Sequence, residues 1–119
     1  MIIIKHPTQE QIQRFWGWCG IEHRYIQGEG LSHKLKGDWF YGTPILDLNN
    51  IFKYAVPRLM NRYQLYIDFG ISLYDVTLIE CTDNTIHKAI NTCESDLALA
   101  LFWAINELIC LEELKYDSL

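Results

Sequence analysis

The first apolar pattern along the chain has the period of a helix and covers residues 8–19. Thr8 begins it and Gln11 follows three residues later, the spacing of a capping box, while Gly20 is a natural stop. The apolar residues recur at spacings of three and four and lie on one helical face: Ile12, Phe15, Trp16 and Cys19.

Short β segments follow at residues 23–27, 31–36 and 39–41, and they predict a hairpin or a small meander. Gly28 and Gly30 lie in the first connection, where glycine permits positive φ. A second helix is predicted over residues 49–62. Its apolar pattern continues through Pro57, which favours a kink over a break.

Alternating apolar residues then predict strands over residues 63–90, with a change of parity near 72–75 that indicates a turn or bulge. A further turn is predicted at Asp83 and Asn84, followed by a strand over 85–90. The last helix covers about 95–116, with Ser95 as its cap. Residues 97–105 are apolar on every side, which predicts burial against the sheet and against either other helices or a second subunit.

The predicted order is α-ββ-α-βββ-α, without a linker or a repeat. We therefore expect a single α+β domain over residues 1–119, with an antiparallel sheet sandwiched by helices.

Composition narrows the class of protein. Half of the 119 residues are hydrophobic, which excludes a disordered chain. The net charge of −5 argues against general nucleic-acid binding and against an anionic membrane surface. No apolar run is long enough for a membrane span, so we expect no membrane partner and a cytoplasmic location.

Catalytic motifs are absent: the chain has no nucleophile elbow, phosphate loop or dinucleotide fingerprint, and we expect no enzyme and no cofactor. Asp68 and Glu80 could meet across the predicted hairpin as a carboxylate pair, but exposed strand faces commonly carry such charges. Cys19 and His23 have a metal-ligand spacing without a second pair, so we expect no metal and mostly buried, reduced cysteines. His33, on a predicted strand, is expected to be solvated.

The strongest candidate for ligand binding is a stripe on the middle helix. Tyr54, Arg58 and Arg62 recur every four residues, and arginine binds phosphate bidentately beside a ring that stacks on a base. The alternative is a solvated face whose arginines pair with acids such as Asp47 or Asp68. Trp39 is a second candidate, as a stacking platform or as core. Asn91 is a third, as a ligand contact or a cap of the last helix.

The chain resembles the phage ABA sandwich domain family, small α+β proteins of bacteriophages and prophages. The likeness lies in WGWCG at residues 16–20, NNIFKYAV at 49–56, the predicted hairpin at 63–81 and SDLALALFWAI at 95–105. It implies a phage-encoded protein in the bacterial host. Some phage proteins of similar build are oligomers that capture cyclic nucleotide or cyclic ADP-ribose immune signals without cleaving them.

The residues and the resemblance together lead to one expectation. The protein is expected to be a non-enzymatic homo-oligomer that sequesters a small anionic ligand, such as a cyclic nucleotide, in anti-defence. The alternative is a protein-interaction module or an inhibitor that docks onto a host protein.

Overall fold

Helices alternate with two groups of three strands along the chain. The computed structural model describes residues 5–60, 62–82 and 85–117. Its elements are α1 (Gln9–Trp18), β1 (His23–Ile26), β2 (Gly30–Leu35), β3 (Asp38–Tyr41), α2 (Leu48–Asn50), η1 (Ile51–Ala55), α3 (Val56–Leu59), β4 (Tyr63–Phe69), β5 (Tyr74–Thr82), β6 (Thr85–Glu94) and α4 (Leu97–Asp117). The predicted α+β class is confirmed. The order agrees roughly: the first β group has three strands, β1–β3, instead of the two in the predicted order, and they form the meander.

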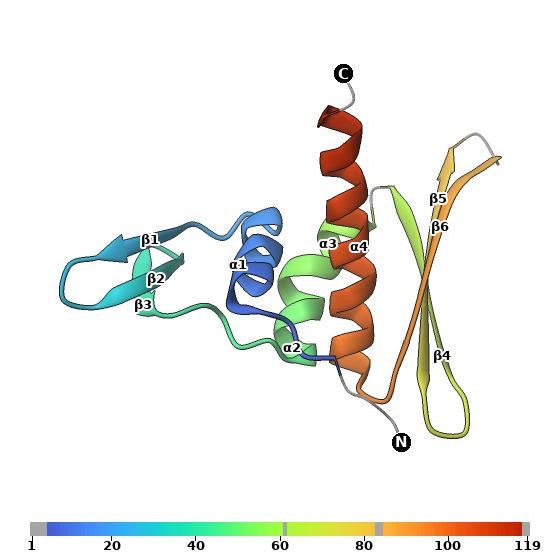
Figure 1. The fold of residues 1–119 in the computed structure, drawn as a ribbon, viewed down its shortest axis with the longest axis horizontal. Coiled ribbons are helices and arrows are strands. Elements are labelled where there is room, and N and C mark those ends of the chain that lie inside the picture. The colour runs from blue at the N-terminus through green and yellow to red at the C-terminus, as the bar shows by residue number, and fades with distance from the viewer. Residues whose placement is uncertain (1–4, 61, 83–84, 118–119) are drawn as a thin grey trace.

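The layers differ from the predicted sandwich. There are two separate antiparallel sheets, each three-stranded, in the orders β1-β2-β3 (the first sheet) and β4-β5-β6 (the second sheet). The helices lie between them: the second sheet flanks α4, and the first sheet projects from the opposite side of the molecule (Figure 1). The prediction places a single sheet between helices, whereas the structure has helices between two sheets.

The ends of α1 follow the sequence closely. The Thr8 hydroxyl accepts from the Gln11 N–H at 3.1 Å, and the Gln11 side chain accepts from the Thr8 N–H at 2.9 Å, which completes the predicted capping box. Gly20 has φ 91°. The next N–H, that of Ile21, reaches the carbonyl of Trp16 at 3.0 Å, so the helix ends in a Schellman motif.

The middle helix continues through Pro57 by means of a π-helical turn. The N–H of Val56 bonds to the carbonyl of Ile51, five residues back, across η1. This wider turn comes directly before Pro57, whose ring would otherwise clash with the preceding α-helical turn. The helix ends at Leu59, three residues earlier than predicted.

The apolar stretch of α4 is buried within the chain. Phe102 packs on Phe15 of α1 with ring centroids 4.9 Å apart, while the same helix lies against β5 and β6. Ala100, Leu101, Phe102, Ala104 and Ile105 are fully buried. The sequence predicts that either other helices or a second subunit cover the second side of this helix, and in the structure other helices cover it. The cap is Asp96 rather than Ser95, since its carboxylate accepts from the N–H of Leu99 at 3.1 Å.

The second sheet places one apolar face against α4. Val76, Leu78 and Ile90 are buried there, and the predicted change of parity is the turn between β4 and β5. β6 runs on to Glu94, four residues beyond the predicted strand end. The predicted turn at Asp83 and Asn84 lies outside the described residues.

No helix in the described parts of the chain is both long and apolar enough to span a bilayer.

Candidate functional site

The five residues predicted to bind a ligand do not form one site. Trp39 lies in the first sheet, Tyr54 and Arg58 face α1, Arg62 follows the end of α3, and Asn91 lies on β6. The sheets that hold Trp39 and Asn91 stand on opposite sides of the helices (Figure 1).

The predicted Tyr54, Arg58 and Arg62 stripe is wrong because the helix ends at Leu59. Tyr54 packs edge-on against Trp16 with centroids 6.3 Å apart, and the Arg58 guanidinium lies 5.1 Å from the Trp18 ring. These two side chains therefore face α1 rather than forming an open row.

Arg62 points to the second sheet. Its guanidinium pairs with the Glu80 carboxylate at 3.2 Å. Arg62 is thus acid-paired, as in the alternative, but with a different acid from Asp47 or Asp68. Glu80 lies opposite Tyr63 in the strand register. Burial and the Glu80 carboxylate both raise the pKa of the Tyr63 hydroxyl, so Tyr63 stays protonated. Asp68 lies opposite Asp75, so Asp68 and Glu80 do not meet.

Asn91 lies on β6 rather than in a loop before α4, and it does not cap that helix. Its amide donates to the Asp75 carboxylate at 2.6 Å and to the Thr77 hydroxyl at 2.9 Å. The side chain therefore links β6 to β5 on the face turned away from α4. Its donors are engaged by the strand next to it.

Trp39 has two basic residues over its ring, Arg24 and Lys34, whereas Tyr54 has one, Lys53. The register pairs Trp39 with Lys34, and Tyr41 with Ser32, which is in turn opposite Arg24. Paired residues in a sheet share a face, so Arg24, Lys34, Trp39 and Tyr41 lie on one side of the first sheet. We call this set the basic-aromatic face.

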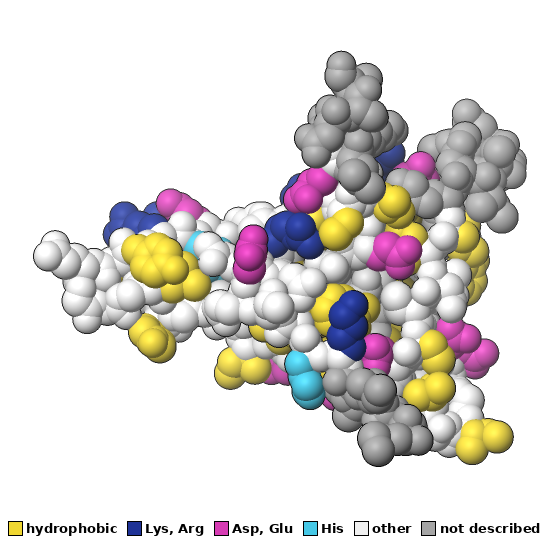
Figure 2. Space-filling view, in the orientation of Figure 1, with side chains coloured by type: hydrophobic (Ala, Val, Ile, Leu, Met, Phe, Trp, Pro, Cys, Tyr) yellow, Lys and Arg dark blue, Asp and Glu magenta, His cyan; other side chains and the backbone are white. Residues whose placement is uncertain are grey.

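The geometry of the basic-aromatic face positions cations beside rings. The Arg24 guanidinium carbon lies 4.0 Å from the centre of the Trp39 ring, and the Lys34 ammonium lies 5.9 Å from it. Tyr41 is 82% exposed. Figure 2 shows hydrophobic side chains beside Lys or Arg side chains on the projecting first sheet.

Two local features fix this arrangement. Lys36 and Gly37 both have positive φ, which gives the tight two-residue turn that sets Lys34 opposite Trp39. Gly30 has a φ of 87°, and a Cβ atom at this position would lie 3.8 Å from the Tyr41 ring. The sequence interpretation missed Arg24 and Lys34. The signal was present, because a two-residue turn at 36–37 determines which residues share a face with Trp39.

The opposite side of the first sheet carries two histidines. His33 is buried, not solvated, because its Nδ1–H donates to the Gly42 carbonyl at 2.7 Å and its ring stacks on Phe40. His23 lies 6.2 Å from His33 between ring centroids. Burial lowers the pKa of His23. The hydrogen bond to the Ile21 carbonyl acts in the opposite direction, and the nearby His33 lowers the pKa further.

The cysteines are less uniformly buried than predicted. Cys93 is exposed, and Cys19, Cys93 and Cys110 are free thiols. Burial raises the pKa of the Cys19 thiol to about 12, against the opposing effect of Arg58. Within the described residues no cluster of three or more His, Cys, Asp or Glu side chains is placed to hold a metal ion.

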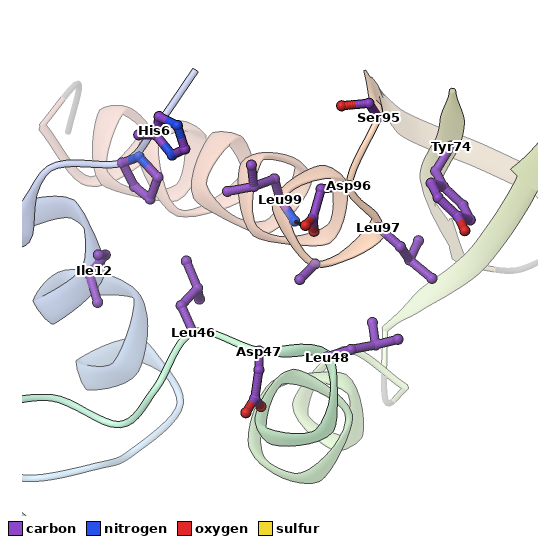
Figure 3. Close-up of a pocket in the computed structure, with 12 residues that line it drawn as sticks. His6, Ile12, Leu46, Asp47, Leu48, Tyr74, Ser95, Asp96, Leu97 and Leu99 are labelled. Carbon is purple, nitrogen blue, oxygen red and sulfur yellow. Dashed lines mark hydrogen bonds between the residues drawn. The ribbon is translucent and has the colours of Figure 1, made fainter. Parts of the chain in front are cut away.

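A groove of about 730 Å³ lies beside the starts of α2 and α4 (Figure 3). Leu46, Leu48 and Leu97 line it together with Asp47 and Asp96. Each aspartate accepts from a helix N–H, at 2.8 Å for Asp47 and 3.1 Å for Asp96. A carboxylate therefore already caps the start of each helix, and the negative charge of the two carboxylates disfavours an anionic ligand in the groove.

No protein-family model, curated protein or solved structure matches this chain. The resemblance to phage ABA sandwich domains therefore stays a prediction.

Proposed function

We propose that this protein binds a small anionic ligand of the nucleotide class on the basic-aromatic face and does not convert it. The observation that carries the proposal is the stacking of Arg24 on Trp39. Neither Arg24 nor Lys34 forms an ion pair with any residue that the structure describes. Their charges are therefore available to a phosphate.

The chemistry of this face suits a nucleotide. The cation–π contact with Trp39 holds the Arg24 guanidinium beside the ring, and a guanidinium can bind phosphate bidentately. Exposed Tyr41 offers a ring for a base. The sequence carries no recognised catalytic motif, which favours sequestration over catalysis. Immune signals such as cyclic nucleotides or cyclic ADP-ribose, captured by a phage-encoded protein in the bacterial cytoplasm, are the ligands that the family resemblance favours.

A thermal-shift screen of cyclic nucleotides and cyclic ADP-ribose isomers tests the proposal. A ligand present at 100 times its Kd stabilises a protein by about 2.7 kcal/mol, so binding raises Tm measurably. Lys34→Glu should abolish the shift. Lys53→Glu makes the same charge change on the exposed side of η1 and should retain it.

Recovery of the ligand after heating separates sequestration from catalysis. We expect the ligand to be released intact. A converted product, or a thermal shift that survives Lys34→Glu, would overturn the proposal.

A protein-interaction module is the second candidate, favoured by exposed apolar side chains on the first sheet and the segment that follows it. Tyr25 and Ile45 are 79% and 73% exposed, and Phe40 is also exposed. Under this alternative none of the nucleotides raises Tm, and binding to a purified host protein is lost on Tyr25→Ser.

A further inference from the structure

β4 is an edge strand without the devices that normally protect such an edge. Among the described residues it pairs with β5 alone, and α4 packs on β5 and β6. Its seven residues include no proline, lysine or glycine, and its pairing with β5 runs without a bulge. An open strand of this kind is a template for pairing with another strand.

Apolar side chains are exposed on both faces of this edge. Tyr66 is 53% exposed on the face turned away from α4, while Ile67 and Phe69 are 40% and 58% exposed on the other face. Asp68 is the one charged residue in the strand. The combination favours a partner that covers both faces at once, as an added strand does.

The direction of the backbone groups follows from the hairpin. The N–H of Gly70 bonds to the carbonyl of Leu73, so this pair is hydrogen-bonded. Hydrogen-bonded and non-hydrogen-bonded pairs alternate in an antiparallel ladder. The N–H and C=O groups of alternate residues therefore point to the open edge: Tyr63, Leu65, Ile67 and Phe69.

We infer that the β4 edge is the interface with a second copy of this chain, joined antiparallel about a two-fold axis at Tyr66 into a continuous sheet. This register is the two-fold arrangement that pairs all seven residues of β4. It places Leu65 opposite Ile67 of the second copy, and both have outward backbone groups. It also places Gln64 opposite Asp68 of the second copy, whereas an axis at Asp68 would oppose two carboxylates.

The strand is thus self-complementary in apolar pattern, backbone direction and charge, which is why a second copy is the occupant we assign. This interface is independent of the proposed ligand site, because β4 belongs to the second sheet and the basic-aromatic face to the first.

Sedimentation equilibrium with paired variants tests the register. Gln64→Lys creates two symmetric ion pairs with Asp68 of the second copy and should lower the dimer Kd roughly twofold to tenfold. Gln64→Glu should raise it by a similar factor. Ala89→Lys, on the exposed outer face of β6, is the control and should leave it unchanged. A chain that is monomeric at every concentration, or equal effects of Gln64→Lys and Gln64→Glu, would overturn the inference.

Cross-linking provides a second readout. In the inferred register Tyr66 lies opposite Tyr66 of the second copy in a non-hydrogen-bonded pair. The Cα atoms of such a pair are about 4.5 Å apart, a distance that a disulfide can span. Tyr66→Cys should form a covalent dimer on oxidation, identified by a peptide linked through position 66. Thr77→Cys, on the same face of the central strand, should not. The opposite pattern would contradict the inference.

Discussion

At the scale of single residues, Lys36 holds the turn that organises the candidate site at a conformational cost. Its φ is 53°, in the left-handed region that lysine occupies unfavourably. The turn keeps Lys34 opposite Trp39, so a residue that is locally strained supports the basic-aromatic face.

Lys36→Asn should therefore stabilise the protein. We expect the free energy of unfolding in urea to rise by about 0.5–1 kcal/mol, since Asn enters the left-handed region at lower cost than Lys. Lys36→Ala removes the same charge without that preference and should bring no gain. Equal effects of the two variants would show that charge, not backbone conformation, matters here.

His23 should make stability depend on pH. Burial lowers its pKa in the folded state from the ordinary value of 6.5. At pH values between the lowered and the ordinary pKa, the unfolded chain binds more protons than the folded chain. The free energy of unfolding therefore falls as pH drops through this window, and above the window the protein keeps its full stability. Thermal melts between pH 5 and pH 8 should show a shallower acid-side decline in His23→Gln. Parallel profiles for the two proteins would contradict this assignment.

At the scale of elements, features set by local sequence were predictable and features set by distant partners were not. The Thr8 and Gln11 capping box and the Gly20 stop depend on a few neighbouring residues, and both are confirmed. Asn91 lies outside the predicted strand over 85–90, because the length of β6 is fixed by its pairing with β5, which the sequence pattern does not contain.

The candidate site shows the same division. Alternation within a strand is local, so the predicted strand over 39–41 already places Trp39 and Tyr41 on one face. Arg24 and Lys34 join them through register across three strands. The predicted Tyr54 to Arg62 stripe requires a kinked helix that continues to residue 62 with α-helical spacing. The structure instead has a π-helical turn before Pro57, and the helix ends at Leu59.

The burial of α4 on both sides can be tested by overpacking. Ala104 is fully buried. Ala104→Leu should lower the free energy of unfolding by about 1–3 kcal/mol, because the neighbouring elements leave no room for extra methylene groups. Glu107→Leu adds an apolar side chain on the exposed side of the same helix and should change stability by about 0.5 kcal/mol or less. Similar effects at both positions would contradict two-sided burial.

At the scale of the whole molecule, the first sheet projects from the helices and carries the proposed ligand site away from the core. The radius of gyration is 15.6 Å. A compact domain of this length is expected to have about 13.5 Å. The excess agrees with the projecting sheet in Figure 1. Substitutions on the basic-aromatic face should therefore alter binding while leaving the folding of the helices and the second sheet intact.

Calorimetric titration with the cyclic nucleotide that gives the largest thermal shift tests the central claim most directly. Arg24→Glu should weaken binding at least tenfold, since hydrogen bonds to charged groups contribute about 1.5–3 kcal/mol. The Tm of the free protein should fall only slightly, through loss of the cation–π contact with Trp39. Lys53→Glu should bind like the unmodified protein. An affinity unchanged by Arg24→Glu would contradict the assignment of the basic-aromatic face as the ligand site.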